Sequence, residues 1–352
     1  MTEIPRAPGA AAPPFRSASP PRGVPLQLVY LCRRETWERK MSRVRFHSMR
    51  AIGRIADVVW TGPGWRGWDD GAPVQDNLDR LLGGRDPDLV IGYKPLDLPG
   101  FAATRAPRCV RYNEMYDVDW TLRELQGSNA DLVVCHHRND WLEWRERLRT
   151  QPLPRQPELV HIAHCAEASV FRPSGAPKTT DLLLVGATDV TTVLGRHYPL
   201  RDRMPAVFAR LAGRYRCAVQ AHPGYDLGDA HTDRYAREFA AAVDAARIGV
   251  TCSGAPRSRY GKYVEVPMCG TALAADLPDE AQDQLRRFVI ELDPAWTDDR
   301  LASTLAWWLD HPAELQRRVE DGLAYAALYT QEQYAWRFVR EVRRFLRMAV
   351  PA

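Results

Sequence analysis

Short, continuously apolar runs alternate with longer amphipathic stretches along this chain, and the alternation occurs twice. In the first half the apolar runs cover residues 26–31, 57–61, 89–93, 109–112, 132–135 and 159–162, and the helical stretches cover residues 33–53, 74–82, 120–126 and 139–149. A strand that is apolar at every position is buried on both faces, which is typical of a parallel sheet covered by helices. The first half is therefore expected to form a doubly wound α/β domain.

A Pro- and Gly-rich segment, residues 171–178, interrupts this pattern, which then starts again. The second half is predicted to hold strands at residues 181–185, 217–221, 248–252 and 289–292 and a further apolar strand after Gly270. Helices are predicted at 201–214 and 231–246, and two helices close the chain, at 298–329 with a break near residues 311–312 and at 331–348. A chain of 352 residues is also too long for one ordinary core. We predict an α/β fold with two Rossmann-like, doubly wound domains facing a cleft, where the carboxyl ends of their strands bind ligands.

The predicted domain boundaries leave two terminal segments. Residues 1–24 are rich in Pro, Ala and Arg and are expected to be a disordered tail, residues 25–170 the first domain and residues 171–330 the second. The last helix, within residues 331–352, carries an apolar stripe with several Arg residues. Such a helix can lie on a membrane surface, but we favour a crossing back to pack on the first domain.

Composition narrows the class of protein. A formal net charge of +4, spread along the chain, does not form the clustered basic surface expected of a nucleic-acid-binding protein. The seven Cys residues include no CxxC pair, which indicates reduced thiols and a cytoplasmic location. No apolar run approaches the length of a membrane span. The mild positive charge is compatible with an anionic small ligand.

Lysine is rare in this chain, and one lysine lies in an informative place. Lysine supplies four of the 48 Lys and Arg residues, at Lys40, Lys94, Lys178 and Lys262. Lys262 and Glu265 lie on a short predicted helix that follows a strand, so the ammonium could bind a phosphate and the carboxylate a ribose diol. A surface ion pair at i,i+3 spacing is the alternative. Tyr260, two residues before Lys262, is included in the candidate donor site.

Two further segments of the second half could contact the same ligand. Gly186 ends a predicted strand, and Arg201 begins the next helix, where its guanidinium could grip a diphosphate. The alternative for Arg201 is a solvated side chain beside a capping turn. His222 follows another strand and either frames a nucleobase or lies in a plain turn.

The first half offers candidates for catalysis and for acceptor binding. Glu114 and Asp117 follow one predicted strand, and the pair His136–His137 follows the next. These side chains could act as a general base or bind hydroxyl groups, although carboxylates at strand ends also cap helices and one His could simply be packed. The acceptor-side candidates form a separate set: Arg33, Trp37, Gly64 and Trp65. The His residues show no compact ligand spacing, so no metal site is expected.

Several segments of the second half resemble those of a known family. Residues 260–273 (YGKYVEVPMCGTAL), together with 198–201 (YPLR) and 320–322 (EDG), look like the donor-binding segments of group-one glycosyltransferases of the GT-B fold, and in particular of the spore-maturation-type branch. Residues 164–173 look like the family's hinge. The resemblance spans roughly residues 160–345, and over residues 25–160 only the order of strands and helices supports it.

The resemblance implies transfer of a sugar from a nucleotide-activated donor without a bound metal or other cofactor. By position, Glu265 would hold the donor ribose, and Arg201 and Lys262 the diphosphate, with the acceptor bound to the first domain. Two departures are evident. Arg257 stands eight residues before Glu265, where retaining members usually carry another Glu, and residues 31–34 (LCRR) replace the family's Gly-rich first loop.

The sequence therefore predicts a glycosyltransferase that uses a nucleoside-diphosphate sugar and a small-molecule acceptor, with the leaving diphosphate stabilised by Arg and Lys. Two alternatives stay open: a nucleotide-sugar epimerase or coupling enzyme on the same fold, and a non-catalytic sugar-nucleotide-binding protein. The sequence leaves open the sugar, the base, the acceptor, the stereochemical outcome and the oligomeric state.

Overall fold

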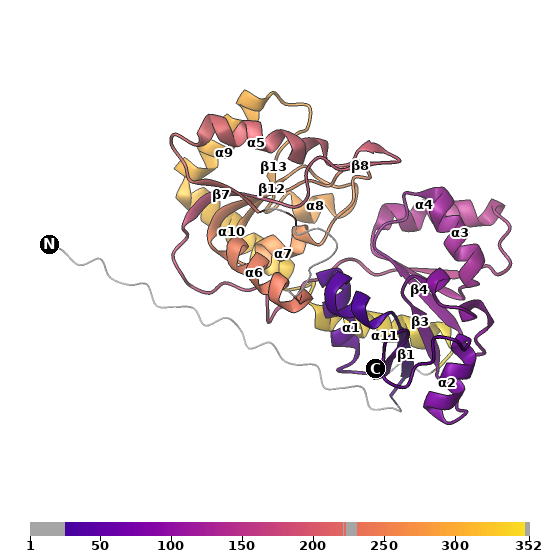
Figure 1. Ribbon diagram of the computed structural model, residues 1–352. Coiled ribbons are helices and arrows are strands. Elements are labelled where there is room, and N and C mark those ends of the chain that lie inside the picture. The colour runs from indigo at the N-terminus through magenta and orange to yellow at the C-terminus, as the bar shows by residue number, and fades with distance from the viewer. Residues whose placement is uncertain (1–24, 221, 223–230, 349–352) are drawn as a thin grey trace.

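A computed structural model describes residues 25–220, 222 and 231–348. Two α/β lobes lie side by side, and the last helix runs back from the second lobe to the first (Figure 1). The predicted tail at residues 1–24 lies outside the described residues. We call residues 25–170 together with the last helix the N-terminal domain, and residues 171–330 the C-terminal domain.

The N-terminal domain is built on a six-stranded parallel sheet with the order β2-β1-β3-β4-β5-β6. Its strands are β1 (Gln27–Leu31), β2 (Asp57–Thr61), β3 (Leu89–Gly92), β4 (Arg108–Tyr112), β5 (Leu132–Cys135) and β6 (Glu158–His161). All six lie within one or two residues of their predicted positions. The four inner strands are buried along nearly their whole length, whereas the edge strands β2 and β6 are mostly half-buried. In the register, Val29 of β1 lies between Val59 of β2 and Val90 of β3.

Helices cover both faces of this sheet. One face packs against α1 (Arg43–Ile52) and α11 (Gln331–Phe345), and the other packs against α2 (Val74–Leu82), α3 (Val118–Ser128), α4 (Arg138–Thr150) and two short 3₁₀ turns, Pro95–Asp97 and Phe101–Ala103. On α11, Tyr334, Phe338 and Val342 are buried against Leu28 and Leu132 of the sheet. The C-terminal helix thus completes the core of the N-terminal domain.

The C-terminal domain is built on a five-stranded parallel sheet with the order β10-β7-β11-β12-β13. Its strands are β7 (Thr180–Val185), β10 (Cys217–Gln220), β11 (Ala246–Val250), β12 (Ala272–Ala275) and β13 (Ile290–Glu291), and a separate hairpin comprises β8 (Thr191–Thr192) and β9 (Gly195–Arg196). Since β7 lies between β10 and β11, the order of the strands reverses beside β7. In doubly wound sheets ligands bind at the carboxyl ends of the strands at such a point.

Helices also cover both faces of the second sheet. One face packs against α5 (Pro199–Leu211) and α9 (Asp298–Asp310), and the other against α6 (Thr232–Asp244), α7 (Lys262–Met268), α10 (Pro312–Ala326) and the short α8 (Gln282–Leu285). Two doubly wound domains with a returning terminal helix confirm the predicted fold class.

The predicted single helix over residues 33–53 is wrong in its middle. A π-helical turn (Thr36–Lys40) ends at Met41, whose φ and ψ are −76° and 131°, and α1 starts only after Ser42, which is also extended (φ −60°, ψ 139°). Contacts with the other domain accompany this break, because the Thr232 hydroxyl donates a hydrogen bond to the carbonyl of Met41 (3.2 Å). The amphipathic pattern runs through the break, so it gives no sign of this tertiary contact.

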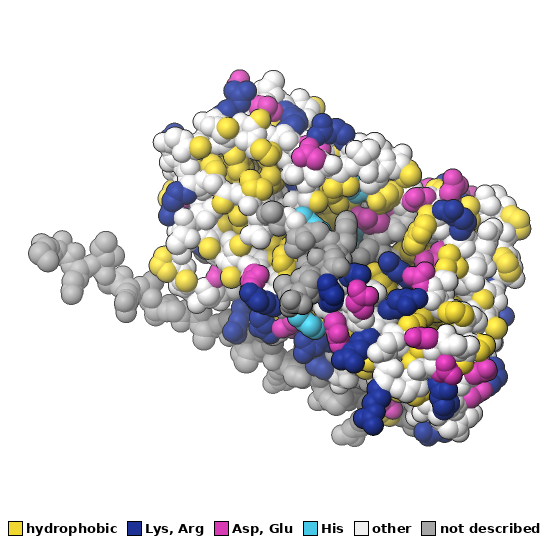
Figure 2. All heavy atoms as spheres, in the orientation of Figure 1, with side chains coloured by type: hydrophobic (Ala, Val, Ile, Leu, Met, Phe, Trp, Pro, Cys, Tyr) yellow, Lys and Arg dark blue, Asp and Glu magenta, His cyan; other side chains and the backbone are white. Residues whose placement is uncertain are grey.

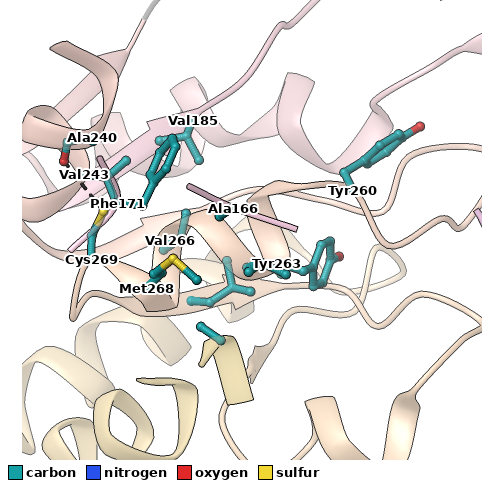
Figure 3. Close-up of a cluster of buried hydrophobic side chains, with 14 of the residues drawn as sticks. Ala166, Phe171, Val185, Ala240, Val243, Tyr260, Tyr263, Val266, Met268 and Cys269 are labelled. Atoms are coloured by element: carbon teal, nitrogen blue, oxygen red, sulfur yellow. Dashed lines mark hydrogen bonds between the residues drawn. The ribbon is translucent and has the colours of Figure 1, made fainter. Parts of the chain in front are cut away.

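The short helix α7 begins at Lys262, between the two starting points considered from the sequence. Pro267 consequently lies in its last turn, where the missing N–H costs one hydrogen bond to Tyr263. Apolar packing against the core of the C-terminal domain stabilises this helix. Val266, Met268 and Cys269 lie in the same cluster as Phe171 and Val185 (Figure 3).

Two features bear on the protein's environment. All seven Cys residues are free thiols, six of them buried and Cys217 half-buried. Within the described part of the chain, no helix is long and apolar enough to cross a lipid bilayer.

Candidate functional site

A cavity of about 300 Å³ lies between the two domains. The carboxyl ends of both sheets open onto it, as Tyr93 follows β3, Glu114 follows β4, His137 follows β5 and His222 follows β10. Its other lining residues are Arg39, Lys40, Met41, Ser42, Arg43, Val44, Asn113 and His164 from the N-terminal domain and Tyr198, Thr232, Tyr235, Tyr260, Gly261, Lys262 and Glu265 from the C-terminal domain. Figure 2 shows Lys, Arg, Asp and Glu side chains gathered around the junction of the two lobes.

Gly186, Arg201 and Lys262 converge beside β7. Gly186 has a φ of +110°, and a Cβ atom built on it would lie 2.2 Å from Nη1 of Arg201 and 2.9 Å from Cε of Lys262. Only a residue without a side chain leaves room for both cations. The structure therefore brings together three of the residues that the sequence assigned to a diphosphate site.

Arg201 is fixed behind this point and does not itself line the cavity wall. Its side chain is 1% exposed, its Nη1 donates to the carbonyl of Ala187 (2.9 Å), and its guanidinium lies 3.5 Å from the centre of the Tyr198 ring. A buried guanidinium stacked on an aromatic ring keeps its charge in one orientation. The alternative of a solvated Arg201 is thus wrong.

Lys262 lies in front of Arg201 and lines the cavity. Burial, together with the positive charges of Arg43 and Arg201, lowers the pKa of Lys262 to about 7. Desolvation and the positive charges of Lys262, Arg43 and Arg201 lower the pKa of His222 to about 4, which keeps this imidazole neutral at physiological pH. An anion placed here would relieve the repulsion among the cations.

Glu265 is buried and binds a residue of the other domain. It is 1% exposed, and both of its oxygens accept hydrogen bonds from Arg43, from Nε at 2.8 Å and from Nη2 at 2.6 Å. The alternative prediction, in which Glu265 forms a surface ion pair with Lys262, is therefore wrong. No motif or spacing in the sequence distinguishes Arg43 from the other 43 arginines.

Glu114 of the N-terminal domain lines the cavity and contacts residues of the C-terminal domain. Its Oε1 lies 3.8 Å from Nε2 of His197, and a hydrogen bond of 3.0 Å joins that nitrogen to the hydroxyl of Tyr260. Burial would raise the pKa of Glu114, but hydrogen bonds from His197 and Tyr260 and the nearby His137 lower it overall. Glu114 is thus a carboxylate at neutral pH that faces the cavity.

The two adjacent His candidates have different environments. His137 lines the cavity, is 1% exposed, and has no hydrogen-bond partner on either ring nitrogen, although its Nδ1 lies 3.5 Å from the Asp140 carboxylate. His136 turns away, with Nδ1 2.9 Å from the carbonyl of Ile162, and burial lowers its pKa well below the usual value. His164, the first residue of the segment that resembles the family's hinge, also lines the cavity.

Several predicted site residues lie outside the cavity lining. Asp117 caps α3 by accepting a hydrogen bond from the Trp120 N–H (3.0 Å), the structural role that was its alternative. Trp37 packs in an aromatic cluster, and Trp65 donates from its indole to the carbonyl of Cys32 (2.8 Å). Arg33 and Gly64 are exposed and do not line the cavity either. From this part of the chain, residues 39–44 line the cavity instead.

Arg257, which replaces the expected Glu, does not line the cavity. It adopts a left-handed backbone conformation (φ +49°), and its Nε donates to Asp279 at 2.5 Å. Asn139 of the N-terminal domain donates to the carbonyl of Pro256 beside it (3.0 Å). Arg257 therefore belongs to the contact between the domains. Among the described residues, no group of three or more His, Cys, Asp and Glu side chains could hold a metal ion.

No family model matches the sequence, and a search of curated proteins finds no match. Solved structures do match over nearly the whole chain. Sucrose-phosphate synthase from Thermosynechococcus elongatus is 13% identical with a TM-score of 0.56 (92% of this chain, 99% of that one), and Anabaena HepE with UDP and glucose is 11% identical with a TM-score of 0.57 (90% and 99%). An alpha-glucosyltransferase with UDP-glucose and DNA containing an abasic site is 11% identical with a TM-score of 0.55 (91% and 99%). At such identities the likeness shows the fold, and this chain has the GT-B fold of glycosyltransferases.

Proposed function

We propose that this protein is a glycosyltransferase that moves a sugar from a nucleoside-diphosphate sugar to a small-molecule acceptor. The observation that carries the proposal is the convergence of Gly186, Arg201 and Lys262 at the strand-order reversal beside β7, with Glu265 on the same helix as Lys262. A glycine that admits two cations, next to a carboxylate, matches a diphosphate followed by a ribose.

The structural neighbours support this class of donor. HepE was solved with UDP and glucose, and the alpha-glucosyltransferase was solved with UDP-glucose. We therefore rank UDP-sugars first among donors. Placement in the spore-maturation-type branch is also a proposal, and it rests on residues 260–273. A cytoplasmic location is a further proposal, supported by the seven free thiols.

In the proposed reaction, the bond between the anomeric carbon and the diphosphate oxygen breaks as an acceptor oxygen bonds to that carbon. The bonding electrons leave with the diphosphate, and the proton of the acceptor hydroxyl passes to the Glu114 carboxylate. Arg201 and Lys262 stabilise the negative charge that grows on the leaving group, because they are already fixed in a partly dehydrated site. These two cations supply the charge for which some transferases use a divalent ion, so we propose a metal-independent reaction.

The acceptor would enter from the N-terminal side of the cavity. Glu114 is ionised at neutral pH and can accept a hydrogen bond from the acceptor hydroxyl, which orients the attacking oxygen. His137 lines the cavity without a hydrogen-bond partner on either ring nitrogen, so it can bind a hydroxyl group of a ligand.

Donor binding and turnover test the proposal. Calorimetry with UDP-, GDP-, ADP- and dTDP-sugars should identify one base, and incubation with that donor should release the nucleoside diphosphate, faster with an acceptor than without one. A protein that binds none of these donors would contradict the proposal. Conversion of the donor to another nucleotide sugar would instead show an epimerase.

One observation favours a second candidate, a sugar-nucleotide-binding protein without catalysis. Arg257 replaces a carboxylate that the resembling family uses at the donor sugar, and its side chain is engaged by Asp279 away from the cavity. Tight donor binding with no nucleotide release over a broad acceptor panel would favour this candidate over the transferase.

A further inference from the structure

Arg43 holds Glu265 across the boundary between the domains. The two residues are separated by 222 positions, and two parallel N–H···O bonds of 2.8 and 2.6 Å join the guanidinium to the carboxylate. Both side chains are largely buried, with Arg43 13% and Glu265 1% exposed. A two-bond contact of this kind fixes the carboxylate plane as well as its position.

The C-terminal domain fixes Arg43 from several sides. Its guanidinium lies 4.3 Å from the centre of the Phe239 ring on α6, and the carbonyl of Met41, two residues earlier, accepts a hydrogen bond from Thr232. The break between the π-helical turn and α1 carries Arg43 into this position. The contact is therefore built by both domains and is not an exposed pair of long, mobile side chains.

Glu265 keeps acceptor capacity for a ligand while it is bound to Arg43. An ionised carboxylate offers about four acceptor positions on its two oxygens, and Arg43 uses one on each. Glu265 also lines the cavity. Two hydroxyl groups of a ribose can thus bind to the same carboxylate without displacing the arginine.

We propose that Arg43 is a positioning residue for ribose recognition: the N-terminal domain orients the carboxylate with which the C-terminal domain reads the donor ribose. This inference rests on the proposed function of the site. Since Arg43 and Glu265 belong to different domains, the ribose site is complete only when the domains are together. Discrimination between ribose and deoxyribose then depends on Arg43, a residue of the N-terminal domain.

The test compares affinities for UDP, GDP and ADP with those for their 2′-deoxy counterparts, by calorimetry on the full chain. The wild type should prefer the ribonucleotide by about tenfold or more, as expected for one hydrogen bond to a charged group. Arg43→Ala should reduce this preference to below about threefold, and Arg43→Lys should also reduce it, because an ammonium cannot form the two-bond contact. Glu265→Gln should reduce it similarly, and the double variant should lose little more than either single variant.

Arg50→Ala is the matched control. Arg50 lies on the same helix and pairs across the same domain boundary with Asp233 at 3.5 Å, but it does not line the cavity. It should keep the wild-type preference for ribose. The inference is overturned if Arg43→Ala keeps that preference while weakening ribo- and deoxyribonucleotides equally, which would indicate a direct contact of Arg43 with phosphate. Additive losses in the double variant would also overturn it. A wild type that binds no nucleotide would overturn the proposed function itself, and this inference with it.

Discussion

Gly186 and Arg201 occupy adjoining space so tightly that a Cβ atom on the glycine would lie 2.2 Å from Nη1 of the arginine. The φ of Gly186, +110°, is also one that other residues rarely adopt. The path of the chain after β7 and the position of the buried cation therefore depend on each other.

Gly186→Ala should displace Arg201 and strain the backbone. We expect a loss of about 1–3 kcal/mol in the free energy of unfolding and weaker donor binding, measured by urea denaturation and calorimetry. Gly213→Ala is the control, since a Cβ atom at Gly213 meets no atom within 4 Å. Equal stability and donor affinity in both variants would contradict the packing argument.

Lys262 should make donor affinity depend on pH. Its pKa is about 7 in the folded protein, so the ammonium is present below pH 7 and is lost above it. With a nucleotide sugar as ligand, affinity should be highest below pH 7 and should fall by up to about tenfold per pH unit above it, with proton uptake on binding. Lys262→Met should bind more weakly and with little pH dependence between pH 6 and 9, whereas Lys94→Ala, outside the cavity lining, should retain the wild-type profile.

Lys262 should make stability change with pH in the direction opposite to donor affinity. The ordinary pKa of a lysine, 10.5, applies to the unfolded chain, so between about pH 7 and 10.5 the unfolded state binds more protons than the folded state. The free energy of unfolding contributed by Lys262 should therefore rise with pH across this window. The free energy of unfolding, measured by urea titration at a series of pH values, should rise more steeply with pH in the wild type than in Lys262→Met. Equal dependence on pH in the two proteins would show that the pKa of Lys262 is not lowered.

Glu114 and Asp117, two acidic residues of one segment, should respond differently to the same substitution. Glu114→Gln removes the negative charge next to His197 and Tyr260, so we expect about a 10²–10⁴-fold lower kcat with little change in donor KM. Asp117→Asn keeps an oxygen that can cap α3 and should retain near wild-type kcat and stability. Steady-state kinetics on both variants provide the measurement. A larger loss in Asp117→Asn would place the catalytic carboxylate at 117 instead.

The terminal helix should be needed for the stability of the N-terminal domain. Phe338 on α11 is 0% exposed and packs in the cluster that covers one face of the first sheet. Phe338→Ala should lower the free energy of unfolding by about 3–5 kcal/mol, with donor affinity preserved under native conditions. Arg340→Ala, on the exposed side of the same helix, should change it by less than about 0.5 kcal/mol. Similar denaturation midpoints for the two variants would show that α11 contributes little to this core.

The apolar runs were sufficient to predict the strands of the two parallel sheets, but not the hairpin of β8 and β9, which contains no apolar run. Each run is long enough for one buried strand and is bounded by amphipathic stretches, so burial on both faces is the arrangement that these residues favour. Gly186 could be selected from the sequence because it ends a predicted strand, and Arg201 because it begins the next helix. Lys262 and Glu265 could be selected because a rare lysine and a carboxylate lie on a short helix that follows a strand.

The tertiary structure decided which of those residues face the cavity and what they contact. Residues 33–53 show one amphipathic pattern, but contacts with the C-terminal domain accompany a break at Met41–Ser42 that brings Arg43 to Glu265. Likewise Asp117 and Glu114 follow the same strand, and only the local backbone turns one to cap a helix and the other toward His197. Local sequence preferences set the elements, because whether a stretch is continuously apolar or amphipathic is decided by neighbouring residues. The site depends on contacts between residues far apart in the chain, such as Arg43 and Glu265, 222 positions apart, which no local pattern encodes.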